Sequence, residues 1–289
     1  MKIHCIGIEE QIVKDLAVSL AANGFEVTSS SADDDAVNDC EFDSGIKLIN
    51  KELDKVIIGR QVDYCHEELR EAQRLGIPIY SYSRFITDLC QDKQRIVFVG
   101  EIDAAAISVL VIKILDYLNK EFDYVVDSNL LENTVRLTDA PVVLLLSDER
   151  DSSVLDEEPQ CITYNHNIAL ISDLCWQPSV SCINIESYAS RLNIFADNSP
   201  KGGTLVYYKE NILAYDIGNK DRLDVKQISY LQHEHIIEND VSYLVTPTGK
   251  VNCSDIITPC TVSASLILLN NLGIKTDTFY RALNDISKT

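Results

Sequence analysis

Residues 95–118 have the form of a phosphate-binding strand, loop and helix. A buried strand at 96–99 leads into a glycine, and an apolar helix starts a few residues later. Phosphate-binding loops at such a place surround phosphates with backbone N–H groups and a lysine, while a hydroxyl holds Mg²⁺. The loop here consists of Gly100, Glu101, Ile102, Asp103, Ala104, Ala105 and Ala106. Because it has no lysine and no hydroxyl, it fits a degenerate nucleotide site and equally an ordinary turn that never bound nucleotide.

A second candidate loop follows the first expected strand. Nucleotide-binding α/β proteins carry G-x-G-x-x-G at this place, but here only Gly7 is present and Ile8, Glu9 and Glu10 follow it. A pyrophosphate beside these glutamates would meet like charge, at a cost of about 1 kcal/mol per pair at ~4 Å in water and roughly 4 kcal/mol at a surface-like dielectric. Since acidic side chains at a helix N-terminus are favoured by the helix dipole, we expect both glutamates to stabilise the first helix.

Three other polar clusters have residue types that could hold an ion. His233 and His235 flank Glu234, but alternation along a β segment places the glutamate on the opposite face, so a solvated strand face is the better interpretation. The Asp-Glu-Arg-Asp stretch at 148–151 follows a buried strand, where α/β proteins place metal-binding carboxylates, although a salt-bridged loop fits as well. The Lys-Gly-Gly stretch at 201–203 predicts a turn and is weak evidence for phosphate binding.

Composition limits the class of protein. The chain has 289 residues, 46% of them apolar, and a formal net charge of −20, which argues against nucleic acid and anionic membranes as partners. The nine cysteines form no Cys-x-x-Cys pair and lie mainly in apolar contexts, as expected for buried thiols in a reducing compartment. No apolar run approaches the roughly 18 residues that span a bilayer, and no signal peptide precedes the first strand. We therefore expect a soluble, cytoplasmic protein.

The elements that must position the candidate loops alternate between strand and helix. This alternation predicts an α/β fold with a parallel sheet covered by helices on both faces. The charged connector at 91–95 is the predicted domain boundary. The expected strands of the first part are 3–8, 25–28, 56–58 and 77–80, and the expected helices are 12–22, 67–75 and 84–90.

The second part is expected to add strands to a further sheet and then to change in character. From Gly202 onward the pattern predicts a hairpin, with strands at 204–208 and 212–215 joined by a turn at 209–211. The other expected strands are 96–99, 124–126, 142–146, 168–171, 225–230 and 241–245, and the expected helices are 185–195, 261–272 and 277–286.

Taken together, these segments resemble the Mur ligase family, the ATP-dependent ligases that extend the peptide of cell-wall precursors. Within it they are most similar to the branch whose members act on UDP-N-acetylmuramate. The matching stretches are 3–8 (IHCIGI), 56–59 (VIIG), 76–82 (GIPIYSY), 167–172 (NIALIS), 246–249 (TPTG) and 279–283 (FYRAL). The resemblance covers essentially the whole chain. It implies a Rossmann-like N-terminal parallel-sheet domain at 1–92 and a degenerate P-loop-type central α/β domain with a β-hairpin region at 93–289, with the C-terminal ligase domain absent.

The resemblance also implies a vestigial UDP site in the first domain. The family's loop G-x-G-G-x-x-M falls on this region, so Glu9 and Glu10 replace its second and third glycines. The family's aspartate after the second strand corresponds to Ser31. The implied UDP-site positions are Gly7, Ile8, Glu9, Glu10, Ser31, Gly59 and Arg60.

A vestigial ATP and metal site is implied in the second domain. The family's G-[ST]-H-G-K-T-T falls on residues 100–106, so Ala104 stands for the lysine and Ala105 for the magnesium-binding hydroxyl. Leu146 stands for a metal-binding glutamate of E-x-D-E, and Pro178 for a histidine near the metals. The family's H-N-x-x-N signature is replaced within 256–261.

These departures predict a protein without ligase activity, although the family uses ATP and Mg²⁺. No cofactor, no metal and no catalytic residue is predicted, and the expected role is binding or regulation, with a protein or a cell-wall precursor as partner and homo-oligomers possible. One alternative is a split ligase that needs a separate C-terminal domain and whose phosphate site is rebuilt from Lys201 or Arg60. Another is a pocket for a small uncharged or cationic ligand near Gly59, Arg60 and Tyr82, at strand ends where α/β sheets bind ligands.

Overall fold

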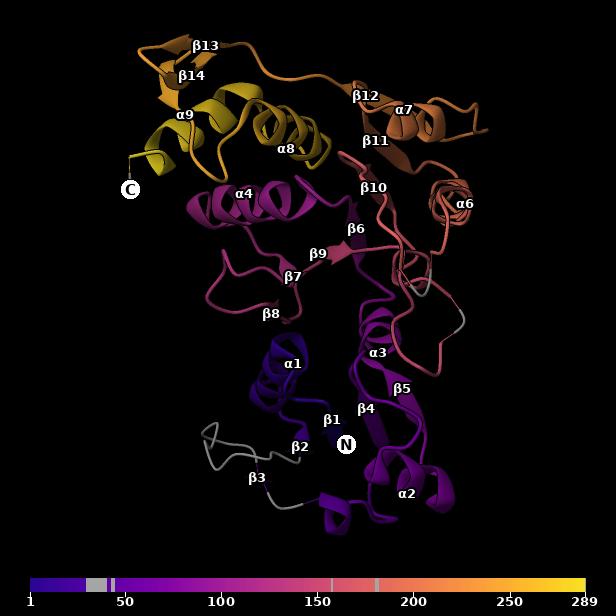
Figure 1. The fold of residues 1–289 in the computed structure, drawn as a ribbon. Helices are drawn as coiled ribbons and strands as arrows, with labels where there is room; N and C mark the ends of the chain where they lie inside the picture. Colours follow the sequence, from indigo (N-terminus) through magenta and orange to yellow (C-terminus); the bar gives the residue numbers. More distant parts are fainter. Residues whose placement is uncertain (30–40, 43–44, 157, 180–181, 289) are drawn as a thin grey trace.

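The computed structural model describes residues 1–29, 41–42, 45–156, 158–179 and 182–288, and Ser31 of the expected UDP site lies outside them. The described residues form a parallel sheet before the connector at 91–95, a mainly parallel sheet after it and a small antiparallel sheet (Figure 1). The expectation of an α/β fold built on parallel sheets is confirmed.

The first sheet is fully parallel, with the strand order β3-β2-β1-β4-β5. This order matches the first five strands of the doubly wound order 3-2-1-4-5-6. Its strands are β1 (Lys2–Ile6), β2 (Glu26–Ser29), β3 (Glu41–Phe42), β4 (Lys55–Ile58) and β5 (Ile79–Ser81). Its helical segments are α1 (Gln11–Ala22), the 3₁₀ turn η1 (Gly45–Leu48), α2 (Glu67–Leu75) and α3 (Tyr82–Leu89).

The second sheet has the strand order β12-β11-β10-β6-β9-β7-β8, and β8 alone among its described strands runs antiparallel to its neighbour. Its strands are β6 (Gln94–Val99), β7 (Asp123–Val125), β8 (Val135–Arg136), β9 (Val142–Ser147), β10 (Ile168–Ile171), β11 (Thr204–Tyr208) and β12 (Lys226–Tyr230). The helices of this part are α4 (Ala104–Tyr117), α5 (Gln160–Thr163), α6 (Ile185–Asp197), α7 (Ile212–Gly218), α8 (Pro259–Asn271) and α9 (Thr276–Ile286).

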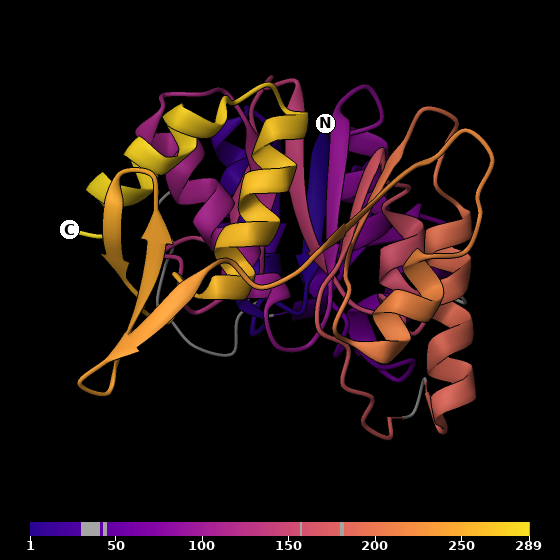
Figure 2. The same ribbon diagram turned by 90° about the horizontal axis from the view of Figure 1, so that it is seen from above.

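Strand β6 is buried on both faces, which explains its unbroken apolar sequence. Val97 and Val99 face one hydrophobic cluster, which is continuous with the core around β1 and α1. Ile96 and Phe98 face the other, which includes α4, α8 and α9. Figure 2 shows α8 and α9 on one side of the second sheet and α6 and α7 on the other. Packing on both faces fixes the position of β6, and therefore also the point at which the loop after it begins.

The expected hairpin after Gly202 is wrong. Residues 212–218 form helix α7, because the side chain of Asn211 accepts a hydrogen bond from the Ala214 amide (2.9 Å) and caps a new helix. Strand β11 instead pairs in parallel with β12. Gly218 permits this packing, since a Cβ there would lie 2.1 Å from the Tyr207 ring. The antiparallel region begins later, in a sheet of β13 (His235–Glu238), β14 (Val241–Thr246) and β15 (Gly249–Asn252).

The short elements β3, β8, β15 and α5 were not expected from the sequence, because each has four residues or fewer and carries no readable period. Among the described residues, no helix combines the length and the apolar character needed to cross a bilayer.

His166 makes stability depend on pH. Its side chain is 1% exposed, its Nε2 lies 2.9 Å from the Ser199 hydroxyl, and burial followed by the charge of Arg95 lowers its pKa to about 4. Because the unfolded histidine titrates near pH ~6.5, protonation favours the unfolded state as pH falls from there toward ~4. We expect the free energy of unfolding to drop by roughly 2 kcal/mol more between about pH 7 and about pH 4.5 in the native protein than in a His166→Gln variant. Urea denaturation at both pH values measures this; equal losses in the two proteins would contradict it.

Candidate functional site

A cavity of about 520 Å³ lies between the two parallel sheets, at the carboxyl ends of their strands. The first sheet contributes Arg60 after β4 and Tyr82 after β5. The second contributes the loop after β6 and the end of β9. Open α/β sheets bind ligands at this edge, so the cavity is the candidate site. Its walls include Ile12, Gly100, Glu101, Ala105, Leu146, Asp148, Gln160 and Pro178.

Gly100 is required where β6 ends. Its φ is +144°, and a Cβ there would lie 1.9 Å from the hydroxyl oxygen of Ser172 on the neighbouring chain segment after β10. The backbone of the two segments is joined on both sides of this contact: the Ser172 amide donates to the Val99 carbonyl (2.9 Å) and the Glu101 amide to the Asp173 carbonyl (3.2 Å). The Glu101 N–H, which a phosphate-binding loop would offer to its ligand, is therefore already bonded within the protein.

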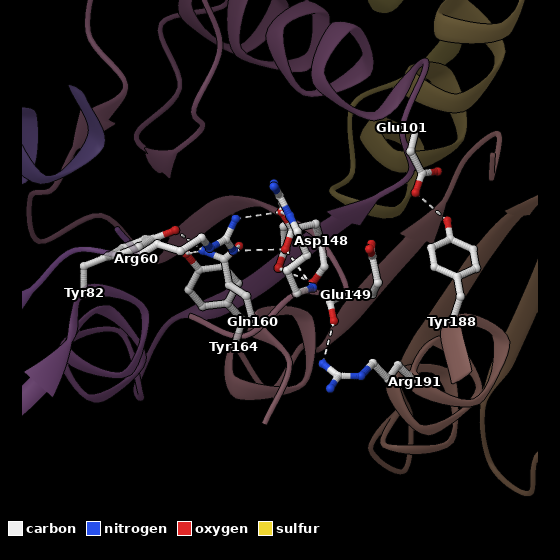
Figure 3. Close-up of polar contacts among 11 residues, drawn as sticks. Arg60, Tyr82, Glu101, Asp148, Glu149, Gln160, Tyr164, Tyr188 and Arg191 are labelled. Carbon is white, nitrogen blue, oxygen red and sulfur yellow. Dashed lines mark hydrogen bonds and ion pairs between the residues drawn. The ribbon is translucent and has the colours of Figure 1, made fainter. Parts of the chain in front are cut away.

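The Glu101 carboxylate is also held by the protein. One oxygen accepts a hydrogen bond from the buried Tyr188 hydroxyl (2.5 Å) and the other from the Cys175 amide (2.9 Å), as Figure 3 shows for the tyrosine. Burial, followed by the hydrogen bond to Glu101, raises the pKa of Tyr188, so its phenol stays protonated and keeps donating. The loop thus presents a fixed negative charge at the edge of the cavity.

The remaining residues of this loop, 102–106, include no basic side chain. Ala104, at the lysine position of the resemblance, is the first residue of α4 and is fully buried in the core, whereas Ala105 lines the cavity. Ile102 is 60% exposed. Asp103 precedes α4 without capping it, and burial and the nearby Asp173 raise its pKa.

Arg60 joins the two sheets across the cavity. Its guanidinium donates two hydrogen bonds to Asp148 (2.8 and 3.0 Å) and one to Gln160 (2.9 Å) (Figure 3). Arg150 donates to the same carboxylate (2.8 Å). The charge of Asp148, two residues after the vestigial metal position Leu146, is therefore compensated by two arginines.

Gln160 extends this network to two tyrosines. Its amide donates to the hydroxyls of Tyr82 (2.5 Å) and Tyr164 (3.1 Å). Burial raises the pKa of Tyr82 to about 12, so the phenol stays neutral in ordinary buffers. Sequence reasoning missed Gln160, because it lies in a four-residue helix with no recognisable motif.

In the other candidate loop, which follows β1, the Glu10 side chain lies against Gly59 and Gln61. Its carboxylate accepts a hydrogen bond from the Gln61 amide (2.7 Å), and a Cβ on Gly59 would lie only 2.2 Å from the same oxygen. Gly7 has φ +92° and Ile8 packs against the core. Glu10 immediately precedes α1 but makes no capping hydrogen bond with its side chain.

The structure separates His233 and His235 from this cavity, whereas the loop at 148–151 lies in its wall. His233 bonds through Nε2 to the Tyr280 hydroxyl (2.8 Å), and His235 opens β13. The described residues contain no group of three or more histidine, cysteine or carboxylate side chains arranged to hold a metal ion. The loop at 148–151 is salt-bridged, with Asp151 paired to Arg191 (2.7 Å).

Lys201 lies at the other end of the second sheet. The stretch at 201–203 precedes β11 and lines a separate cavity with Arg95, at the amino ends of the strands. A five-residue strand such as β11 spans about 17 Å, so Lys201 cannot reach the loop after β6. Leu146 and Pro178, by contrast, line the same cavity as Gly100 and Glu101, so the positions that the resemblance assigns to ATP and metal lie together.

The cavity at the carboxyl ends of the two sheets, bordered by a single-glycine loop before an apolar helix, lies where open α/β folds bind their ligands. Residues 2–94 match the family model described as Mur ligase family, catalytic domain. The chain is thus similar to the Mur ligase family over its first parallel sheet.

One curated relative is the UDP-N-acetylmuramate–L-alanine ligase of Desulforamulus reducens. It is 24% identical over 204 residues, which are 67% of this chain and 41% of the relative. The match therefore spans less than half the length of that enzyme.

Solved structures of related ligases have the same fold. UDP-N-acetylmuramate:L-alanyl-γ-D-glutamyl-meso-diaminopimelate ligase from Neisseria meningitides superposes with a TM-score of 0.80 at 14% identity, over 98% of this chain and 97% of that one. UDP-N-acetylmuramate-alanine ligase from Thermotoga maritima gives 0.73 at 16% identity, over 99% of this chain and 68% of that one. At these identities the likeness establishes the fold.

Proposed function

We propose that this chain is a Mur ligase homologue that has kept the fold without ATP-dependent ligation and serves as a binding or regulatory protein in peptidoglycan synthesis or recycling. The observation that carries the proposal is the loop after β6. Both the amide and the carboxylate of Glu101 are bonded within the protein, and Ala104 is buried. Phosphoryl transfer depends on positioning and charge neutralisation by lysine, Mg²⁺ and backbone donors. The resemblance assigns the phosphate site to this loop, and the Glu101 carboxylate there would oppose a bound phosphate instead of neutralising it.

The first loop supports the same proposal. Glu10 covers Gly59 and takes the Gln61 amide as its donor, so a diphosphate placed there would meet a carboxylate. With residues 1–92 and 93–289 proposed as the two domains, both vestigial sites would face the cavity between them. A cell-wall precursor or a protein partner that contacts this cavity would need no triphosphate.

The alternative of a rebuilt ligase gains no support from its two candidate cations. Lys201 lies at the far end of the second sheet, and the Arg60 guanidinium is already bonded to Asp148 and Gln160. Either residue would have to leave its present surroundings before it could contact a phosphate at the loop after β6.

Isothermal titration with Mg-ATP tests the proposal. We expect no saturable heat with ATP up to about 1 mM, and no phosphate release above background with UDP-N-acetylmuramate and amino acids. A UDP-N-acetylmuramate–L-alanine ligase serves as the positive control. A Glu10→Gln/Glu101→Gln double variant is also expected to remain inactive, since removing the acids does not restore a lysine. Micromolar Mg-ATP binding by the native protein would overturn the proposal.

A further inference from the structure

A cavity of about 660 Å³ lies at the amino ends of β6, β10 and β11, at the opposite end of the second sheet from the loop after β6. The Lys-Gly-Gly stretch at 201–203 forms part of its wall, and the proposed function leaves this stretch unused. Cavities that bind small molecules have volumes of about 300–1,000 Å³. The cavity is therefore large enough for a small organic molecule.

Hydrogen bonds hold the beginnings of these three strands side by side. The Arg95 amide donates to the side-chain oxygen of Asn167 (2.8 Å), and the Asn167 amide donates to the Arg95 carbonyl (2.9 Å). The Thr204 amide donates to the Asn167 carbonyl (3.1 Å). Gly203 permits this close approach, since a Cβ there would lie 2.8 Å from the Pro200 carbonyl oxygen and 3.1 Å from that of Asn167. The wall of the cavity is therefore preformed.

Arg95 brings a buried positive charge to this wall without a counter-charge. Its side chain is 8% exposed, and its Nε donates to the Asn165 carbonyl (2.8 Å). Its Nη1 donates to the carbonyls of Cys90 (3.0 Å) and Gln91 (2.7 Å). Within the described ranges, no carboxylate forms an ion pair with Arg95, and its Nη2 donates to no residue. Because buried charges are normally paired, Arg95 favours an anion in the cavity that it lines.

Three other residues of the wall carry donors that have no acceptor in the described part of the chain. Asn167 uses its side-chain oxygen on the Arg95 amide and leaves its NH₂ group without a partner. Lys201 is exposed and forms no ion pair. Thr204 is only 7% exposed, and its hydroxyl makes no hydrogen bond. Buried polar groups are normally hydrogen-bonded, so an unused buried hydroxyl indicates a missing partner.

The available donors favour a phosphate group over a carboxylate. A carboxylate gains most from two parallel hydrogen bonds to the fork of an arginine, but backbone carbonyls already occupy Nε and Nη1 of Arg95. A phosphate group has several oxygens, which can accept separately from Nη2 of Arg95, the NH₂ group of Asn167 and the ammonium group of Lys201.

The other residues of the wall decide what else the ligand can carry. The charge of Lys93 is compensated by its ion pair with Asp123, and the exposed Asp92 is the acidic residue of the wall. The remainder of the wall is mainly polar, since it includes the side chains of Gln94, Thr204 and Asn271. A hydroxylated molecule suits such a wall better than an apolar one.

We propose that Arg95, Asn167 and Lys201 form a binding site for the phosphate group of a small hydroxylated molecule, whose remainder contacts the Thr204 hydroxyl. The site goes beyond the proposed function and shares no lining residue with the cavity between the two sheets. The net charge of −20 opposes the binding of any anion, so affinity for a phosphate compound has to come from these local donors.

The test is isothermal titration of the full chain with glucose 6-phosphate, in phosphate-free buffer at constant ionic strength. We expect saturable binding with a Kd on the order of 1 mM, as a ligand of this size permits. Inorganic phosphate is expected to bind about fivefold more weakly, and glucose is expected not to bind. Absence of glucose 6-phosphate binding at about 10 mM would overturn the proposal. Equal binding of glucose, or binding of inorganic phosphate at least as tight as that of glucose 6-phosphate, would also overturn it.

Variants at the two ends of β11 distinguish the site from the general charge. Lys201→Gln is expected to weaken binding by about tenfold. Lys209→Gln removes the same charge from an equally exposed position at the other end of β11 and is expected to leave the affinity unchanged. Equal effects of these two substitutions would refute a specific site. Thermal unfolding monitors the fold of each variant.

The buried hydroxyl has its own pair of variants. Thr204→Val keeps the shape of the side chain and is expected to weaken binding by about fivefold, whereas Thr204→Ser keeps the hydroxyl and is expected to retain the native affinity. An unchanged affinity in Thr204→Val would show that the hydroxyl does not contact the ligand and would contradict the proposal.

The result is separable from that of the Mg-ATP titration, because the two sites lie at opposite ends of the second sheet. Titration of Lys201→Gln with Mg-ATP makes the distinction. Nucleotide binding that survives this substitution would belong to the loop after β6 and would count against the proposed function alone. Nucleotide binding that disappears with it would belong to the cavity at Arg95 and would support the phosphate site.

Discussion

Gly100→Ala is expected to reduce the free energy of unfolding by about 3–5 kcal/mol, because the methyl group meets two penalties at once. At φ +144° an L-residue is strained, and the added Cβ would lie 1.9 Å from the Ser172 hydroxyl and 3.3 Å from the Asp173 carbonyl. Neither neighbour can withdraw easily, since the backbone of 172–173 is hydrogen-bonded to the β6 end. Urea denaturation of the native and variant proteins measures the difference.

Two further variants separate the strain from the clash. Gly24→Ala has a similarly positive φ (+83°) but nothing within 4 Å of the new Cβ, so a loss of only about 1 kcal/mol is expected. Adding Ser172→Ala to Gly100→Ala removes the closest atom and is expected to recover part of the loss. If Gly100→Ala costs no more than Gly24→Ala, the close contact between the two strand ends is not as described.

Asp15→Ala is expected to cost about 3 kcal/mol, since it removes a buried carboxylate that joins α1 to the second sheet. Asp15 is 9% exposed, and one oxygen accepts hydrogen bonds from the amide (2.6 Å) and the hydroxyl (2.9 Å) of Thr134, just before β8. The other accepts one from Gln11 (2.6 Å). Hydrogen bonds to charged groups contribute about 1.5–3 kcal/mol each, and the buried Thr134 amide would lose its partner.

The matched control is Asp88→Ala on α3, where the carboxylate is exposed and a change within about 0.5 kcal/mol is expected. Urea denaturation of the three proteins provides the comparison. A loss no larger for Asp15→Ala than for Asp88→Ala would mean that the contact with Thr134 does not hold the two sheets together.

These contacts bear on function because they fix the walls of the cavity. The Arg60 pairing with Asp148 and the Asp15 contact with Thr134 both connect the first sheet to the second. Arg60, Asp148 and Gln160 in the cavity wall are already hydrogen-bonded to one another before any ligand binds. A binding or regulatory role that needs no triphosphate is compatible with such a preformed arrangement.

The sequence by itself determined the α/β character of the chain, the place of most long elements and the residue types of the candidate loops. Helix α2 has the expected bounds at 67–75, with Gly76 after it in the left-handed conformation (φ +71°). Strand β10 lies where its apolar run predicted. The missing lysine and hydroxyl of the loop at 100–106 are read directly from residue types. Periodicity, capping and composition are local properties, so a single chain reveals them.

Only the tertiary structure decided which side chains meet around the cavity. Arg60 and Asp148 are 88 residues apart in sequence, as are Glu101 and Tyr188 at 87, and no local pattern joins them. Residues 212–215 were predicted to be a strand but belong to the helix at 212–218. Their apolar residues fit either period, and the cap at Asn211 and the pairing of β12 with β11 decide between the two. Contacts of this kind depend on the order of the strands and on which side chains the packed sheets bring together. Strand order and packing are determined by the whole chain, so a local sequence pattern does not reveal them.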